Sequence, residues 1–274
     1  MNKIALHGAS GRMGKALVAA VRELPYWKLV GAVTASTDSR LGQDTAVIHG
    51  FAYLGVPLSA DVSAAVLAAD VVVDFSQPVA ALQLLKHCQL KRKPVVIGTT
   101  GFSPEAMAEI ETAAKQIPVL VSPNMSVGVN LLFALARIAG KAMADADAEI
   151  IEAHHRYKID APSGTALRLG EVVAQARGTT LAASAVLSRQ GNTGVRESGS
   201  IGFSTIRAGE IVGDHTLLLA TGTEQLEIRH QAFDRRNFAE GALRAAAWLV
   251  GKPAGLYGME DVLGLREAGS AVLA

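Results

Sequence analysis

The sequence has one cysteine, no long apolar run and almost no net charge, and each absence excludes a class of protein. Because Cys88 stands alone, the chain cannot form an intrachain disulfide or a cysteine metal cluster. No uninterrupted apolar run is long enough to span a bilayer. The formal net charge is +1, without an acidic tail, a basic arm for nucleic acid or a polybasic membrane patch. The N-terminus becomes glycine-rich too soon for a signal peptide, so we expect a cytoplasmic protein that binds neither nucleic acid nor membrane.

A glycine-rich loop follows the first apolar run. Residues 4–6 are apolar, Gly8, Gly11 and Gly14 follow at every third position, and apolar residues recur at helical spacing over 17–21. This pattern predicts a strand, a glycine turn and a helix. Such a turn leaves room for phosphates at the helix start, where amides favour negative charge. The alternative is a plain tight turn.

Short apolar runs alternate with helical segments through the first half of the chain. This alternation predicts a parallel sheet with helices on both faces, and ligands bind such sheets at the carboxyl ends of the strands. Small polar residues or bare backbone follow three of the runs, at 75–76, 98–101 and 122–125. They indicate a ligand cleft, with the bare backbone from Gly98 to Gly101 lying beneath a nicotinamide, unless they only make turns. The predicted strands cover residues 28–33, 71–75, 95–97 and 119–121.

The residues after the second predicted strand bear on the choice of nucleotide. In NAD-binding folds an acid near the end of this strand takes the ribose hydroxyls. Here that acid is missing unless Asp38 serves, and Arg12 and Arg40 are placed to reach a ribose phosphate. We therefore favour NADPH with NADH tolerated. The alternative for Asp38 and Arg40 is that both are solvated loop charges.

The second half has a different periodicity, and we place a domain boundary near Gly128. The predicted domains are residues 1–126, with 236–274 packing back on them, and residues 127–235. A helix over 163–176 and strands over 148–155, 186–189, 200–208, 215–220 and 225–231 predict an α+β domain with a meander-like sheet. The apolar run at 216–220 suits a strand that is covered on both faces, which hints at an oligomer.

Titratable groups are densest over residues 152–166. His154 and His155 are adjacent, Lys158 follows, and Ser163 can cap a helix. The stretch combines a group that titrates near neutral pH, a fixed positive charge and helix-start amides that favour anions. This combination can protonate a small anionic substrate. Alternatively the histidine pair is structural, because adjacent strand residues point to opposite faces.

Four runs, at residues 8–14, 98–102, 124–130 and 152–166, together resemble the 4-hydroxy-tetrahydrodipicolinate reductase (dihydrodipicolinate reductase) family. The resemblance implies a Rossmann-like parallel sheet and a second α+β domain with a mostly antiparallel or mixed open sheet. It implies reduction of a cyclic imine dicarboxylate by NADPH or NADH to tetrahydrodipicolinate, in lysine and diaminopimelate biosynthesis. It also implies a homotetramer built through the second domain.

The resemblance assigns roles to individual residues. His154 is the implied proton donor with Lys158 as its catalytic partner, and His155, Gly164 and Thr165 bind substrate. Where some family members have an acid and an arginine after the second strand, this chain has alanine and serine, which leaves the nucleotide preference open. The residues implied to hold the cofactor are Gly8, Ala9, Ser10, Gly11, Arg12, Met13, Gly98, Thr99, Thr100, Ser122, Pro123, Asn124 and Met125.

Two other functions remain open on the residues alone. One is a different two-domain NAD(P)-dependent dehydrogenase, acting on an amino acid or a sugar. The other is a non-enzymatic redox sensor that binds NAD(P). Neither requires the run from His154 to Thr165.

Overall fold

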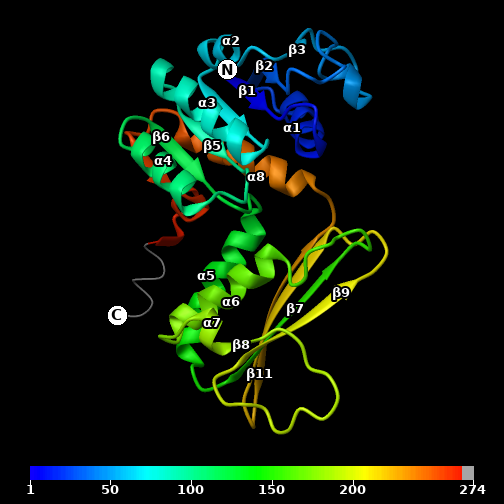
Figure 1. Cartoon of the computed structure of the whole chain (residues 1–274), viewed down its shortest axis with the longest axis vertical. Coiled ribbons are helices and arrows are strands. Elements are labelled where there is room, and N and C mark those ends of the chain that lie inside the picture. The colour runs from blue at the N-terminus through cyan, green and yellow to red at the C-terminus, as the bar shows by residue number, and fades with distance from the viewer. Residues whose placement is uncertain (267–274) are drawn as a thin grey trace. The chain divides into compact units, whose positions relative to one another are not determined.

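The computed structural model describes residues 1–266 and divides the chain into two compact units (Figure 1). Unit 1 consists of Met1–Val127 and Arg235–Gly264, and unit 2 is built on Gly128–Asp234. The segment that the sequence predicts to return to the first domain ends at residue 274, so its last eight residues lie outside the described part.

Unit 1 contains a seven-stranded sheet in which every neighbouring pair is parallel. The strand order is β12-β6-β5-β4-β1-β2-β3. The predicted Rossmann-like parallel sheet is thus confirmed, and the segment around Leu256 adds an edge strand to it. The strands are β1 (Asn2–His7), β2 (Trp27–Val33), β3 (Leu58–Ser59), β4 (Val71–Asp74), β5 (Val95–Ile97), β6 (Pro118–Val121) and β12 (Gly255–Tyr257).

Helices cover both faces of this sheet, and each face has its own apolar core. Ile4 and Leu6 of β1 pack with α1 and α8 on one face, whereas Ala5 packs with α2, α3 and α4 on the other. Cys88 is fully buried in the second core, as its helical apolar setting predicts. The helices are α1 (Arg12–Glu23), η1 (Val47–His49), α2 (Val62–Ala68), α3 (Pro78–Lys91), α4 (Pro104–Ala114), α8 (Arg236–Leu249) and α9 (Met259–Val262).

Unit 2 contains a mixed five-stranded sheet in the order β11-β10-β7-β9-β8. β7 is parallel to β9 and antiparallel to β10. The predicted mixed open sheet is confirmed, but the meander-like order is wrong, because β7 lies between β9 and β10. Alternation along a strand shows which face is buried but not which strand lies beside it. The elements are α5 (Val127–Ala142), β7 (Asp147–His154), α6 (Gly164–Ala176), α7 (Leu181–Ser184), β8 (Ala185–Val186), β9 (Ile201–Arg207), β10 (Gly213–Ala220) and β11 (Gln225–Ala232).

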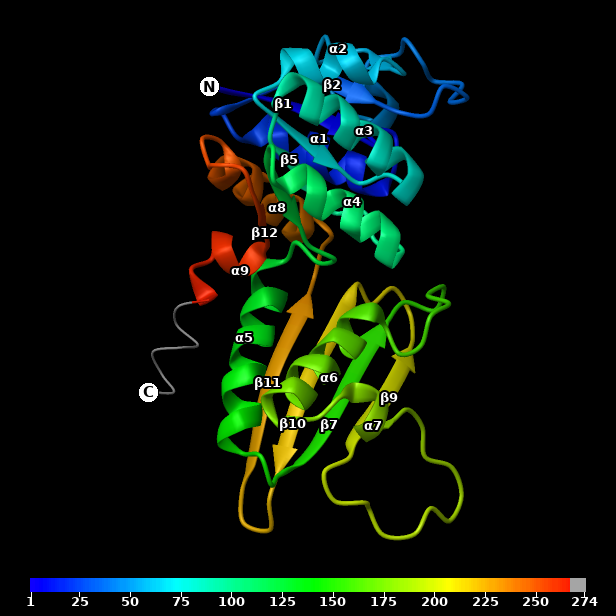
Figure 2. The ribbon, with the colours of Figure 1, turned by 60° about the vertical axis from the view of Figure 1, so that its left-hand side comes forward.

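α5 and α6 cover one face of this mixed sheet (Figure 2). Ile150, Leu217 and Leu219 point into the core beneath the helices and are fully buried. Each such side chain stabilises the fold by roughly 1.5–3 kcal/mol. Leu218 points to the opposite face and is half-buried. The sequence predicts that both faces of β10 are covered. In the described part of the chain, helices cover one of these faces.

Candidate active site and nucleotide site

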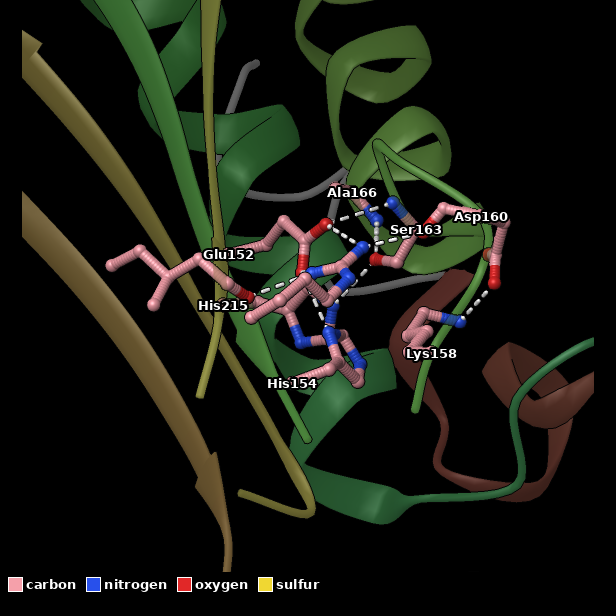
Figure 3. Close-up of polar contacts among 9 residues, drawn as sticks. Glu152, His154, Lys158, Asp160, Ser163, Ala166 and His215 are labelled. Atoms are coloured by element: carbon pink, nitrogen blue, oxygen red, sulfur yellow. Dashed lines mark hydrogen bonds and ion pairs between the residues drawn. The ribbon is translucent and has the colours of Figure 1, made fainter. Parts of the chain in front are cut away.

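The histidine-lysine stretch, residues 152–166, begins within β7 and leaves the sheet of unit 2 at the end of that strand. Side chains alternate along a strand, so Glu152 and His154 share the face that carries Ile150 and packs under the helices. The chain then returns to begin α6, where the Ser163 hydroxyl accepts a hydrogen bond from the amide of Ala166 at 3.2 Å. The predicted serine cap is therefore confirmed. Figure 3 shows Glu152, His154 and Ser163 converging in one cluster.

Glu152 is the centre of this cluster and is 1% exposed. One carboxylate oxygen accepts from His154 Nδ1 at 2.6 Å and from Arg207 Nη1 at 2.9 Å. The other accepts from the Ser163 amide at 3.0 Å and from Arg207 Nη2 at 2.8 Å. Burial opposes ionisation of Glu152, but these hydrogen bonds outweigh burial and lower its pKa to about 2. The carboxylate is therefore ionised at neutral pH and only accepts hydrogen bonds.

His154 consequently has one nitrogen committed and one open. Its Nδ1 donates to Glu152, which leaves Nε2 to exchange protons. Gly213 of β10 lies beside Nε2, and a Cβ added there would be 3.1 Å from it, tighter than most real contacts. Glycine at position 213 thus keeps the space around Nε2 open.

A second histidine lies against His154 but remains uncharged. His215 is 4% exposed, and its ring meets that of His154 edge-on with the centroids 5.2 Å apart. Burial is the main cause that lowers the pKa of His215 to about 3, and the neighbouring imidazole of His154 contributes to the same shift. Its Nε2 lies 3.1 Å from the Ser163 hydroxyl. His215 therefore packs the site without adding a charge near neutral pH.

Lys158 is bound by a different carboxylate from the one that binds His154. Its Nζ donates to Asp160 at 2.8 Å, and this hydrogen bond is the main reason that the pKa of Asp160 is lowered. Arg207 donates to the main-chain oxygen of Asp160. The predicted catalytic pair, His154 and Lys158, is thus connected through Arg207, Glu152 and Asp160.

The predicted substrate-binding residues lie in the loop after β7 and at the start of α6. Nδ1 of His155 is buried and has no hydrogen-bond partner among residues 1–266. Gly164 and Thr165 are the first two residues of α6. An added Cβ at Gly164 would meet no atom within 4 Å, so the helix start is open to a ligand. Helix-start amides favour an anion at this position.

In unit 1 the glycine loop joins β1 to α1, as the sequence predicts. Gly8 has a φ of +78°, and a Cβ there would lie 2.2 Å from the carbonyl oxygen of Phe75. A Cβ at Gly14 would lie 2.1 Å from the carbonyl oxygen of Ala9. Both positions therefore require glycine for backbone approach. Gly11 is the N-cap of α1, so the helix-start amides lie at the end of this loop.

The other predicted members of the glycine loop differ in exposure. Ala9 is fully buried and can offer a ligand only its backbone. Ser10 and Met13 are half-buried, and Arg12 is exposed.

A buried carboxylate connects the end of β1 with the residues that follow β4 and β5. Asp74 is 0% exposed and accepts from His7 Nδ1 and from the hydroxyls of Ser76 and Thr99, each at 2.6 Å. Thr99 in turn accepts from the Ser76 amide at 2.8 Å. Two of the segments that the sequence places at a ligand cleft, 75–76 and 98–101, thus meet at one side chain, together with the end of β1.

Gly98 has an intramolecular reason to be glycine. A Cβ there would lie 2.3 Å from the ring of Phe75. The prediction that bare backbone here makes room for a nicotinamide stays a prediction. Thr100 is exposed beyond it.

The loop after β6 is held by its own hydrogen bonds. Ser122 donates to the main-chain oxygen of Asn124 at 2.7 Å. Pro123 is exposed, whereas Met125 is 1% exposed and belongs to the core under α8. The side chain of Met125 therefore stabilises the unit.

Asp38 and Arg40 form one ion pair beside the glycine loop. Arg40 donates to both Asp38 oxygens at 2.8 Å, and Thr34 donates at 3.0 Å. The hydrogen bond from Arg40 is the main cause that holds the pKa of Asp38 well below its usual range. The Thr34 hydroxyl also lies 2.7 Å from that of Ser10. The two charges are therefore paired with each other in this loop, and the Arg40 side chain remains 42% exposed.

Sequence reasoning missed three side chains on which the histidine cluster depends. Glu152 is two residues before His154, a spacing that places both on one face of a strand and could have indicated it. Arg207 and His215 belong to strands more than 50 residues further on, and no local signal connects them. Within residues 1–266 no three His, Cys, Asp or Glu side chains are grouped to hold a metal. No helix of this part has the length and apolarity to cross a membrane.

Comparison with known proteins follows the division into two units. The model of the dihydrodipicolinate reductase N-terminus matches residues 2–125, and that of the C-terminus matches residues 128–263. A 4-hydroxy-tetrahydrodipicolinate reductase of Thiobacillus denitrificans is 51% identical over 96% of this chain and 99% of its own. A 4-hydroxy-tetrahydrodipicolinate reductase of Hahella chejuensis is 50% identical over 97% of this chain and 100% of its own.

Solved structures share the fold. A dipicolinate-bound dihydrodipicolinate reductase of Paenisporosarcina sp. TG-14 superposes with a TM-score of 0.77 at 24% identity, over 95% of this chain and 99% of its own. An amine dehydrogenase of Mycobacterium smegmatis has a TM-score of 0.67 at 13% identity, over 94% and 95%.

Proposed function

We propose, from the premise that this chain belongs to the dihydrodipicolinate reductase family, that His154 protonates the substrate while a nucleotide bound to unit 1 reduces it. The chain is an oxidoreductase that reduces 4-hydroxy-tetrahydrodipicolinate, a step of lysine and diaminopimelate biosynthesis. The observation that carries the mechanism is the cluster around Glu152, which leaves His154 Nε2 open beside Gly213 and connects His154 to the start of α6 through the Glu152 carboxylate.

The chemistry requires a proton donor. Hydride addition to a ring carbon conjugated to an imine leaves an enamine-type product that must gain a proton. A positioned imidazole can supply it, and general acid catalysis of this kind contributes roughly 100- to 10,000-fold. His154 Nε2 is the donor in our proposal, and Nδ1 stays bonded to Glu152 throughout.

The substrate is a dicarboxylate, and the loop around His154 offers two places for negative charge. The amides of Gly164 and Thr165 at the start of α6 take one carboxylate, and Lys158 takes the other in place of Asp160. His155 supplies its unpartnered Nδ1 as a further contact. These roles follow the family resemblance and are supported by the space beside Gly164.

The nucleotide is NADPH or NADH, and when bound it supplies the hydride. The glycine loop fits its phosphates, because Gly8 and Gly14 allow close backbone approach and α1 begins at the loop. Thr99, which Asp74 holds, and Asn124 flank the site at the strand ends. Arg12 and Arg40 are the two arginines that we expect to meet a 2′-phosphate, so we favour NADPH with NADH tolerated. Gly8, Ala9, Ser10, Gly11, Arg12, Met13, Gly98, Thr99, Thr100, Ser122, Pro123, Asn124 and Met125 form the proposed nucleotide site.

The assembly is proposed to be a cytoplasmic homotetramer built through unit 2, and residues 127–235 are the proposed substrate domain. The half-buried Leu218 and Ile151 and the exposed Ile206 lie on the sheet face opposite α5 and α6. A second copy of this face would remove them from water.

Consumption of NADPH with freshly made cyclic substrate tests the proposal. We expect loss of nucleotide absorbance only when both enzyme and substrate are present. Flat absorbance with verified substrate would exclude this reductase activity. Turnover of an unrelated amino acid or sugar alone would favour another dehydrogenase, and nucleotide binding without any turnover would favour a redox sensor.

A further inference from the structure

Glu152 binds both parts of the proposed site at once. It holds the proton donor through His154 Nδ1 and the start of the anion-binding helix through the Ser163 amide, at 2.6 and 3.0 Å. A single buried side chain therefore sets the spacing between His154 and the start of α6. A substrate whose carboxylate sits on that helix start is presented to Nε2 at a spacing that Glu152 determines.

An unbalanced carboxylate at 2.6 Å would be a poor partner for a general acid. It would stabilise the imidazolium so strongly that the proton would not leave. Arg207 corrects this, because its guanidinium binds both Glu152 oxygens in a bidentate pair and cancels the carboxylate charge.

We propose that Glu152 and Arg207 act as a positioning pair for the reaction: Glu152 orients the imidazole of His154, and Arg207 balances the carboxylate so that the imidazolium can release its proton. This inference rests on the proposed role of His154 as proton donor. Neither residue touches the reacting atoms, so both act through His154.

The other groups that face His154 leave this balance to the pair. His215 of β10 is neutral above about pH 3, and Ser163 at the start of α6 is uncharged. Lys158 and Asp160 of the loop form an ion pair with each other. His230 of β11 pairs across the sheet with His215, and burial lowers its pKa.

The test is the pH profile of kcat in the intact enzyme. The rate falls with rising pH as the donor loses its proton. Glu152→Gln leaves Arg207 positive without its partner, so we expect the fall at a pH lower by about one unit, the effect of one nearby charge. Arg207→Met leaves Glu152 unbalanced, so we expect the fall at higher pH by about as much, with a lower plateau. Arg207→Lys keeps the charge without the bidentate geometry, so its fall should stay close to that of wild type.

Opposite shifts in the two single variants support the pair. Shifts in the same direction, or a lower plateau with an unmoved fall, would reduce both residues to structural supports and overturn the inference. If Arg207→Met does not fold, Glu152→Gln and Arg207→Lys test the inference, because only Glu152→Gln should change the pH at which kcat falls.

A second readout separates this inference from the proposed function. The His154 imidazole can be titrated by NMR in the unliganded enzyme, with the resonance assigned from His154→Gln. Opposite shifts of the titration midpoint without matching shifts in kcat would mean that His154 is not the donor, although the pair still controls it. Unmoved midpoints would overturn the inference even in an active enzyme.

Discussion

Each unit buries one carboxylate beside an imidazole, and the two carboxylates differ in what surrounds them. Asp74 in unit 1 is bound by His7 and by two neutral hydroxyls. Glu152 in unit 2 is bound by a guanidinium, by His154 and by a helix-start amide. Both side chains are at most 1% exposed, so burial alone does not distinguish them.

The difference lies in the charge of the partners and in the space beside the imidazole. The partners of Asp74 come from the end of β1 and from the residues after β4 and β5, and the side chains of His7 and His154 are similarly buried, at 8% and 12% exposed. Glu152 is balanced by Arg207, and its imidazole partner keeps one nitrogen open beside Gly213. We infer that Asp74, among neutral hydroxyls, connects side chains of neighbouring segments, whereas Glu152, balanced by a guanidinium and bonded to His154, is placed to support proton transfer. Five predictions test this contrast.

The largest effect is expected from the same substitution at the two histidines. His154→Asn keeps a donor for Glu152 but cannot transfer a proton, so kcat should fall by about 100- to 10,000-fold. His7→Asn keeps a donor for Asp74 and should leave kcat at saturating nucleotide close to wild type. Steady-state kinetics of both variants check this. Equal losses in the two would erase the distinction.

Breaking the charged pair in unit 2 should cost more stability than any single change around Asp74. Arg207→Met leaves Glu152 buried without its guanidinium, and removal of one partner of such a pair costs about 3–5 kcal/mol of unfolding free energy. Both tryptophans, Trp27 and Trp248, lie in unit 1, so amide hydrogen exchange of β7 and β10 is the appropriate measurement. A smaller loss of unfolding free energy for Arg207→Met than for Asp74→Asn would contradict the prediction.

Unit 2 should lose stability as the pH falls below about 6.5 because of His215. Its pKa is lowered from 6.5 to about 3 by burial, so the unfolded chain binds a proton in this window that the native chain does not. Stability therefore falls with falling pH, by up to about 1.4 kcal/mol per pH unit. His215→Gln should flatten this slope in hydrogen exchange of β10. Measurements at pH 8, where His215 is neutral in both the folded and the unfolded chain, provide the baseline. An unchanged slope in the variant would exclude His215 as the cause.

Removing the charge of Asp74 should have a moderate effect confined to unit 1. Asp74→Asn retains one acceptor but loses partners for His7 or the hydroxyls, which costs about 1–3 kcal/mol. Denaturant unfolding followed by tryptophan fluorescence reports this unit. We also expect weaker nucleotide binding, because the loops after β1, β4 and β5 lose their common partner. Unchanged binding with lowered stability would show that Asp74 supports the fold alone.

The smallest effect is expected at the ion pair beside the glycine loop. Arg40→Leu removes the group proposed to meet a 2′-phosphate, so kcat/KM with NADPH should fall by about tenfold, equivalent to 1.4 kcal/mol, while NADH is affected less. Arg12→Leu is the matched comparison for the second arginine. A strong preference of the wild type for NADH would contradict our choice of NADPH.

Much of the architecture could be read from the chain. Apolar runs such as residues 71–73 are short and continuous, as is typical of strands covered on both faces, and the parallel sheet follows from their alternation with helices. Ser163 predicts the start of α6, because a serine hydroxyl at this position accepts a hydrogen bond from a helix-start amide. The glycine loop and the histidine-lysine stretch were visible for the same reason: their chemistry is contained within a few neighbouring residues.

The partners of those segments were not visible. β7 lies between β9 and β10, an order that periodicity does not encode, and this order alone brings Arg207 and His215 to Glu152. Likewise His7 and Thr99 reach Asp74 only because β1, β4 and β5 are adjacent strands. Local sequence specifies backbone conformation and helix ends, since those depend on near neighbours. The pairing of buried charges depends on which strands lie side by side, and that arrangement arises when the whole core packs.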